Sequence, residues 1–425
     1  MSPTFSSLSS RNYRLYAAGG VVSNTGTWMQ RIAQDWLVIL LTGASGTALG
    51  ITTGLQFLPM LLFSPYAGLI ADRFPKRRLL QVTQVMMAGP AAVLGALAIT
   101  GVVQTWHVYV LAFVFGIGTA FDAPARQSFV SEMVGRDDLT NAVGLNSASF
   151  NMARMVGPAL AGLMIAALGN TIEATGLVIT LNAVSYGAVI LCLQRMRVSE
   201  LDTPEPMARQ KGMIRDGLRY VRGRPDLMML LAIVFFAGAF GLKFQMSSAL
   251  MATEVYGKGA SEYGVLGSVM AIGSLAGALL AARRGGQPRH RLVILSAIGF
   301  GFASIAAGLM PTYLAFALWV PVIGILALTM ITSVNATMQL SVAPELRGRV
   351  MALYMMVFLG GTPFGAPIIG WIGETFGARW TLIAGGGITI LGTLLAVAVF
   401  SRTQGMLDPE ANTRVRPTLL GARSG

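Results

Sequence analysis

The sequence predicts an all-α membrane protein with twelve transmembrane helices, arranged as two six-helix, pseudo-symmetric bundles. Three observations lead to this prediction. Of the 425 residues, 54% are hydrophobic and only 12% are charged, whereas a soluble domain carries about 25% charged residues. Apolar runs long enough to cross a hydrocarbon core of about 30 Å as helices recur along almost the whole chain. A polar stretch rich in Pro and Arg divides these runs into two groups of six.

The predicted spans start after a polar N-terminal stretch without a short apolar region and cleavage site, so we do not expect a removed signal peptide. The first six spans are placed at residues 13–41, 47–70, 78–101, 105–124, 140–168 and 173–195. The second six are placed at residues 227–252, 260–282, 291–310, 313–340, 350–373 and 379–400. We therefore divide the chain into a bundle at 1–195, a linker at 196–225, a second bundle at 226–401 and a tail at 402–425.

The second part of the linker has an amphipathic pattern. Apolar residues at helical spacing alternate with basic ones over Met213 to Arg222. One interpretation is a basic helix lying on the inner membrane surface. A solvated linker that merely contains many cations is the alternative.

The net charge of +13 would suggest nucleic-acid binding in a soluble protein. In the predicted topology with the N-terminus inside, however, 26 of the 31 Lys and Arg residues fall on the cytoplasmic side, and only Lys258 and Arg379 fall outside. This asymmetry follows the positive-inside rule and places both termini in the cytoplasm. We expect a bacterial cytoplasmic (inner) membrane protein with no nucleic-acid partner.

The sequence also argues against several kinds of chemistry. Cys192 is the only cysteine, and the two histidines lie far apart in the chain, so neither an internal disulfide nor a metal site is expected. No phosphate-binding loop of the form G-x-x-x-x-G-K-[ST] occurs. We expect no cofactor, no direct use of ATP and no enzymatic activity.

The two halves show weak internal similarity. The stretch that starts at Ala125 resembles the one that starts at Thr337, and "GPALAG" from Gly157 matches "GAPIIG" from Gly365. Both matches are offset by about half of the chain. Two six-span repeats around a central cavity are a transporter architecture, with the substrate site near the bilayer midplane at the repeat interface.

The loop after the second span reads "GLIADRFPKRRLL". A glycine at position 68 would allow another helix to approach closely, and Asp72 could interact with a neighbouring helix N-terminus and with the loop cations. The loop resembles that of the major facilitator superfamily, Gly-x-Leu-Ala-Asp-Arg-x-Gly-Arg-Lys. The match covers Gly68, Ala71, Asp72, Arg73, Lys76 and Arg77, while Pro75 replaces the second glycine of the pattern. The resemblance implies a gating loop.

The fifth span contains "ARMVGPALAG". Pro158 removes a backbone donor, while Gly157 and Gly162 leave a smooth face for tight packing. An ordinary kinked helix would show the same pattern. The stretch also resembles the antiporter motif of the superfamily, which is associated with export, although Ala153 and Ala161 replace two of its glycines.

The start of the chain and "FDAPARQSFVSEMV" resemble the branch that includes macrolide and enterobactin exporters. One departure concerns proton coupling. Many drug:proton antiporters carry an arginine in span four at the position where this chain has Ala112. That arginine's role is therefore not transferred to this sequence.

Candidate functional residues are instead the polar groups inside the spans. A charge at the centre of a span costs about 2.5 to 3.5 kcal/mol on insertion scales, so such residues usually face a cavity. In span one, Asn24, Trp28, Arg31 and Asp35 share one helix face, and in span five Ser147, Asn151, Arg154 and Pro158 repeat that spacing. We expect both stripes to face the central cavity. A fixed ion pair that only orients helices is the alternative.

We select Asp35 as the proton carrier, with Arg31 and Arg154 as its electrostatic partners and Asp122 as the next carboxylate. Burial and a neighbouring arginine shift the pKa of a carboxylic acid in opposite directions, so a change in their separation could switch Asp35 between neutral and charged forms. The cavity and substrate candidates are Asn24, Trp28, Gln34, Asn151, Lys243 and Met355. Flexible methionines suit a pocket that accepts several amphiphiles, although methionine is also an ordinary core or lipid-facing residue.

These features and the family resemblance together predict a secondary active exporter that works by alternating access. We expect it to expel amphiphilic small molecules, such as drugs or siderophores, in exchange for protons, as a monomer in the lipid bilayer. An uptake symporter or a lipid flippase of the same fold is the nearer alternative. A membrane receptor or scaffold without a transport cycle is the alternative from another class.

Overall fold

The computed structural model describes residues 3–202, 213–283 and 290–400. In the first half, a short 3-10 turn at Pro3–Ser9 precedes six long helices. These are α1 (Arg11–Thr42), α2 (Gly46–Arg73), α3 (Lys76–Ile99), α4 (Thr105–Met133), α5 (Leu139–Ala167) and α6 (Ile172–Gln194). They form one bundle, in which α3 packs against α6, α2 against α4, and α1 against both α5 and α6.

The second half forms another bundle, in which two of the six spans are interrupted. Its helices are α8 (Pro225–Phe236), α9 (Phe244–Leu250), α10 (Ala260–Ala282), α11 (His290–Gly308), α12 (Tyr313–Ser341), α13 (Pro344–Gly360), α14 (Thr362–Phe376) and α15 (Arg379–Phe400). The π-helical turns η3 (Ala237–Gly241) and η4 (Met251–Val255) make one span out of α8 and α9. Similarly, α13 and α14 meet at Gly361 and form another span.

The predicted all-α fold of two six-helix bundles is confirmed. Within the described residues, eleven helical segments are long and apolar enough to cross a membrane. The twelfth is α1, which has 32 residues and carries Arg31 and Asp35. One predicted boundary is wrong, because α4 continues beyond residue 124 to Met133. Pro124 does not end the helix, and Arg126 is accommodated by an ion pair with Asp122 one turn earlier.

The amphipathic helix predicted in the linker exists as α7 (Met213–Arg222), and the protein itself covers its apolar face. α7 packs against α13 and α8 of the second bundle. Val221 is fully buried in a core cluster that also contains Met229 and Val350. The apolar face of α7 is therefore covered by protein. Residues 203–212 of the linker and the predicted tail lie outside the described residues.

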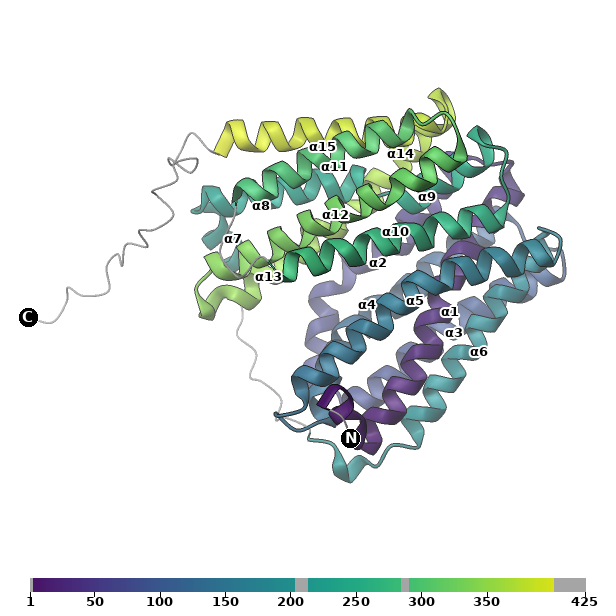
Figure 1. Cartoon of the computed structure of the whole chain (residues 1–425). Helices are drawn as coiled ribbons and strands as arrows, with labels where there is room; N and C mark the ends of the chain where they lie inside the picture. The colour runs from purple at the N-terminus through teal and green to yellow at the C-terminus, as the bar shows by residue number, and fades with distance from the viewer. Residues whose placement is uncertain (1–2, 203–212, 284–289, 401–425) are drawn as a thin grey trace, which may run out of the picture.

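The two bundles meet at one end and diverge toward the other (Figure 1). In the figure, α1 to α6 run downward and α8 to α15 run to the left, away from a shared end. We call this shared end, with the loops at 43–45, 100–104, 168–171, 256–259, 309–312 and 377–378, the closed end. The opposite end, where α1 begins and α15 finishes, is the open end.

Two helix pairs join the bundles, α2 with α14 and α5 with α10. The backbones approach so closely that a Cβ atom on Gly50 would overlap the carbonyl oxygen of Ala366, and one on Gly162 that of Ala260. Ala366 and Gly162 belong to the two repeated motifs, "GAPIIG" and "GPALAG". The internal repeat therefore corresponds to the contacts between the halves.

A carboxylate at the surface of the closed end adds a polar contact between the bundles. Glu374 Oε2 on α14 accepts hydrogen bonds from Ser45 Oγ at 2.7 Å and from the backbone N–H of Thr47 at 2.9 Å. Both donors lie at the start of α2, where a negative charge also interacts favourably with the helix dipole. Glu374 thus stabilises the state in which this end is closed.

Replacing Glu374 by Ala should weaken the closed end. Exposed charge-assisted contacts of this kind are worth about 0.5 to 1 kcal/mol, so the ratio of closed to opened molecules should fall about two- to fivefold. Double electron–electron resonance between spin labels at Leu168 and Trp380, in a Cys192→Ser background, would detect this as a shift toward longer distances.

Glu173→Ala is the matched control. Glu173 is an exposed glutamate in the first turn of α6, at the same end of the molecule. It should leave the distance distribution unchanged. An unchanged distribution for Glu374→Ala, or an equal shift in both variants, would contradict the role assigned to Glu374.

Candidate functional site

A cavity of about 180 Å³ lies between the two bundles, and both bundles contribute to its walls. The lining side chains combine charged, polar and apolar groups. They are Arg31, Asp35, Thr53, Gln56, Phe57, Gly238, Leu242, Lys243, Gln245, Met246, Phe358, Leu359 and Thr362. A cavity with apolar walls and a few polar groups is the usual form of a small-molecule site.

Asp35, the predicted proton carrier, is 8% exposed and lies on the cavity wall. Its Oδ2 atom accepts hydrogen bonds from Tyr263 Oη at 2.6 Å and from Gln245 Nε2 at 2.9 Å. Asp35 is on α1, whereas Tyr263 is on α10 and Gln245 is on α9. A carboxylate of the first bundle is therefore held by two donors of the second.

Of the two expected electrostatic partners of Asp35, Arg31 interacts with it through its charge but not through a salt bridge. Within the described residues, no ion pair joins Asp35 to Arg31 or Arg154. Arg31 follows the predicted helix face and lines the same cavity, but its guanidinium lies over the Trp28 ring, with Cζ 4.8 Å from the ring centroid. Side chains four residues apart on a helix are neighbours, but here Arg31 contacts Trp28 whereas Asp35 accepts hydrogen bonds from the second bundle.

Arg154 approaches the same indole ring from α5, with its Cζ atom 5.7 Å from the Trp28 centroid. It also donates a hydrogen bond to Ser274 Oγ on α10 at 3.2 Å. The predicted close packing of α5 is present here, because a Cβ atom on Gly157 would lie 2.7 Å from Trp28 Cβ. Pro158, the next residue, is buried within the helix.

Lys243 belongs to the cavity wall and is 6% exposed. It stands at the break in its span, just before α9 begins. Its Nζ atom donates to Thr362 Oγ1 at 2.7 Å. Among the residues that the structure describes, no carboxylate pairs with this ammonium group.

The other predicted cavity residues lie in different places. Gln34 is buried and donates to Gln56, which lines the cavity, at 3.2 Å. Asn24 and Asn151 do not line this cavity, and Asn151 donates to the backbone oxygen of Ser147 on its own helix. Met355 is 44% exposed and outside the lining, where Met246 is present instead.

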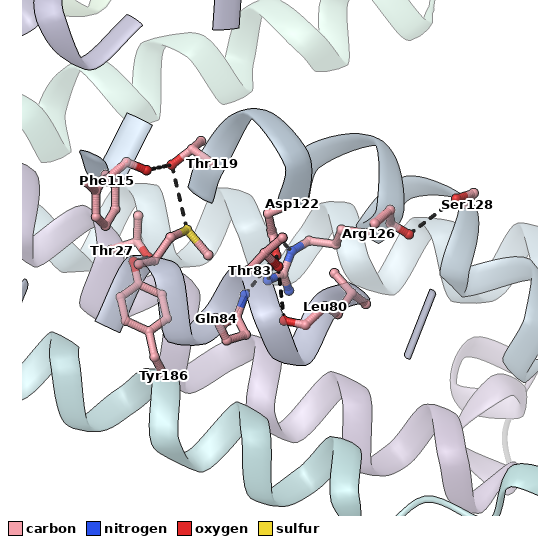
Figure 2. Close-up of polar contacts among 12 residues, drawn as sticks. Thr27, Leu80, Thr83, Gln84, Phe115, Thr119, Asp122, Arg126, Ser128 and Tyr186 are labelled. Atoms are coloured by element: carbon pink, nitrogen blue, oxygen red, sulfur yellow. Dashed lines mark hydrogen bonds and ion pairs between the residues drawn. The ribbon is translucent and has the colours of Figure 1, made fainter. Parts of the chain in front are cut away.

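Asp122 is not near the cavity but inside the first bundle, between α3 and α4 (Figure 2). Its carboxylate pairs with Arg126, with Nε to Oδ2 at 2.8 Å. Thr83 Oγ1 and Gln84 Nε2 both donate to its Oδ1 atom at 2.8 Å. All these partners belong to one bundle. Asp122 therefore forms a fixed network that orients helices, which is the alternative to a cavity role considered for the charges within the spans.

The predicted gating loop is divided between exposed and buried residues. Asp72 and Arg73 are exposed at the end of α2. Arg77 donates to the carbonyl oxygens of Leu193 and Gln194 at the end of α6. The close helix approach expected at Gly68 is absent in this conformation, because a Cβ atom there would meet no atom within 4 Å.

Lys76, the remaining loop cation, forms a buried ion pair that the sequence did not reveal. Its Nζ atom lies 2.7 Å from Glu132 Oε1 on α4, and both side chains are less than 10% exposed. Tyr263, Gln245 and Glu374 were also missed. Gln245 was detectable as a polar residue two positions after Lys243, but spacing alone could not identify its partner.

Comparisons with known proteins agree with this architecture. The family described as "Transmembrane secretion effector" matches residues 2–422. The multidrug efflux pump Tap of Mycolicibacterium fortuitum is 28% identical over 382 residues, which cover 87% of this chain and 90% of that protein. A staphyloferrin A transporter of Staphylococcus aureus is 26% identical, covering 87% and 91%. Macrolide efflux protein A of Streptococcus pyogenes is 24% identical, covering 83% and 88%.

Among solved structures, a bacterial homologue of the human lysosomal transporter Spinster, in an inward-facing and unoccupied conformation, superposes with a TM-score of 0.72. It is 16% identical in sequence, and the match covers 92% of this chain and 98% of that one. At this identity the likeness concerns the fold.

The buried ion pair at the loop yields a stability prediction. Glu132→Gln leaves the Lys76 ammonium buried without a countercharge, which costs about 3 to 5 kcal/mol. The variant should therefore melt at a clearly lower temperature when unfolding in detergent is followed by tryptophan fluorescence. Glu200→Gln is the control, because its pair with Arg197 is exposed and such pairs contribute at most about 1 kcal/mol. Equal melting temperatures for both variants would show that the buried pair is dispensable.

Proposed function

The chain belongs to the transmembrane secretion effector family of the major facilitator superfamily, and from this premise we propose that it is a secondary active exporter working by alternating access. It is a multi-pass membrane transporter and not an enzyme. The relatives whose names specify multidrug or macrolide efflux support export rather than uptake. The proposed cargo is an amphiphilic small molecule, exchanged for protons.

The observation that carries the proposal is the hydrogen bonding of Asp35 across the two bundles. Both donors, Tyr263 and Gln245, belong to the opposite bundle. If the closed end opens, the bundles separate there and these donors move away from the carboxylate. The stability of the ionised form of Asp35 then depends on conformation, which is the requirement for coupling proton binding to alternating access.

The charge distribution supports an orientation for this cycle. The linker and the loops of the open end carry most of the cations, so the open end lies in the cytoplasm. We therefore propose a bacterial inner-membrane protein with both termini cytoplasmic, acting as a monomer, in an inward-open state. Each proton that moves inward contributes about 2.3 kcal/mol per 100 mV of membrane potential, which can drive substrate outward.

The loop after α2 supports a gating role in the opposite state. Asp72 is exposed here and, within the described part of the chain, makes no hydrogen bond or ion pair. We propose that Asp72 finds its partner when the open end closes and the second bundle approaches α2. The loop then stabilises the outward-open state.

The first test is transport by proteoliposomes with an imposed pH gradient, using sulforhodamine B and rhodamine 6G as anionic and cationic amphiphilic dyes. Gradient-dependent movement of either dye supports proton-coupled export. Asp35→Asn should abolish the gradient-dependent part, because the amide cannot carry the proton, while Asp202→Asn, an exposed linker change, should not. Normal gradient-driven transport by Asp35→Asn would refute the assignment. Movement of a dye only down its own concentration gradient would favour uptake or facilitated diffusion. The absence of transport of both dyes would favour a scaffold.

A second prediction concerns the loop. Asp72→Asn should lower the maximal transport rate severalfold while leaving the dissociation constant for the dye within about twofold, because Asp72 lies outside the cavity lining. Asp137→Asn, an exposed aspartate in the loop before α5, is the control. A larger effect of Asp72→Asn on binding than on rate would contradict the gating role.

The orientation can be measured by cysteine labelling in a Cys192→Ser background. A membrane-impermeant maleimide added to intact cells should react with a cysteine at Lys258, at the closed end, and not with one at Arg197, at the open end. Both residues are exposed. The reverse labelling pattern would overturn the assigned orientation.

A further inference from the structure

The central cavity contains an excess of cationic groups. Arg31 and Lys243 both lie on its wall, and Arg154 joins Arg31 through the Trp28 ring that both guanidinium groups contact. Among the described residues of that wall, Asp35 is the only carboxylate. Charges in a membrane interior are costly, so three cations around one acid need an explanation.

The protein neutralises these cations only in part, because the charge of Asp35 acts on Arg31 alone. Asp35 accepts its hydrogen bonds from Tyr263 and Gln245, which are neutral donors. For the part of the chain that the structure describes, the polar contacts of Lys243 and Arg154 are single hydroxyl groups, Thr362 and Ser274. Arg31 has a ring contact and no hydrogen bond there.

Other charges within the helices of this protein are treated differently, which makes the contrast informative. Arg126 is paired with Asp122 and Lys76 with Glu132. A buried cation without a countercharge is normally destabilising by several kcal/mol. Three such cations share a single acid, Asp35, whose hydrogen bonds come from neutral donors. This imbalance indicates that a charge from outside the chain completes the site.

The surroundings also indicate the shape of the ligand. Phe57, Phe358 and Met246 supply apolar surface on the cavity wall, and two guanidinium groups contact the Trp28 ring. Arginine binds planar carboxylate, phosphate and similar oxyanions through paired N–H donors. The apolar wall suits the rest of an amphiphilic molecule.

We propose that Arg31, Arg154 and Lys243 form the anion-binding part of the substrate site, so that the transported class is amphiphilic anions with a carboxylate, sulfonate or phosphate group. This inference rests on the proposed export function and narrows its substrate class. Arg31 and Lys243 approach the anion from opposite bundles. The bound anion therefore contacts both halves and offsets the positive charge of the cavity.

The test measures binding without any gradient, so that it is independent of proton coupling. Purified protein in neutral-lipid nanodiscs is titrated into sulforhodamine B, a net anionic dye, or rhodamine 6G, a cationic dye with the same ring system. Fluorescence anisotropy reports binding, with empty nanodiscs as the blank. We expect the anionic dye to bind at least tenfold more tightly, and its affinity to fall as NaCl is raised from 50 to 500 mM.

The variants Arg31→Gln, Arg154→Gln and Lys243→Met should each weaken binding of the anionic dye about tenfold or more, while Arg31→Lys should restore part of it. Arg197→Gln, an exposed change at the open end, is the matched control and should leave binding unchanged. Monodisperse elution on size exclusion shows that each variant is folded.

Two results would overturn the proposal. One is equal or tighter binding of the cationic dye by the unmodified protein, and the other is binding of the anionic dye that is insensitive to salt and to all three variants. Either result leaves the exporter proposal standing if gradient-driven dye transport is observed. Conversely, anion-selective binding without gradient-driven transport would support this site and refute proton-coupled export.

Discussion

The close backbone contact between the two bundles at the closed end is the constraint on which the rest of the structure depends. Because Gly50 and Gly162 have no side chain, the backbone carbonyl groups of the facing helices can occupy the space where a Cβ atom would otherwise lie. This contact places α9 and α10 of the second bundle against α1 of the first. Only that placement brings Tyr263 and Gln245 within hydrogen-bond distance of Asp35. The chemistry of the cavity is therefore a consequence of packing at the end of the molecule.

The charges within the helices fall into two groups that differ in how they are satisfied. Asp122 with Arg126, and Lys76 with Glu132, are neutralised inside the first bundle. Such groups remain together whatever the relative position of the bundles. Asp35 instead takes its hydrogen-bond donors from the opposite bundle, and no salt bridge joins the cavity cations to an acid among the described residues. This division separates charges that maintain a bundle from charges whose surroundings change when the bundles move.

The sequence was sufficient to predict the spans but only part of the site. The physical reason is that spans depend on local sequence, whereas the site depends on contacts between distant residues. The length of an apolar run identifies a transmembrane helix because each run must be long enough to cross the hydrocarbon core by itself. Helical spacing likewise placed Trp28, Arg31 and Asp35 on one face. Spacing could not reveal Tyr263 or Gln245, because each lies more than 200 residues from Asp35 in the chain. Their contact with Asp35 depends on the relative position of the two bundles. For α7 the pattern specified an apolar face, but not that protein rather than lipid would cover it.

The polar face of α1 limits how the bundles can move. Arg31 and Asp35 are costly in lipid, so this face has to remain against the cavity or the opposite bundle in every state of a transport cycle. A rigid-body rocking of one bundle about the central cavity satisfies this requirement, because it changes the partners of α1 without turning α1 toward the bilayer. In the present state the Asp35 carboxylate is held by the second bundle while Arg31 lines the cavity. Separation of the bundles at the closed end removes the donors of Asp35 and leaves Arg31 as its nearest source of positive charge on α1. The motion that changes access therefore replaces the neutral hydrogen-bond donors of Asp35 by the positive charge of Arg31. This replacement can couple the movement of the bundles to proton binding on α1.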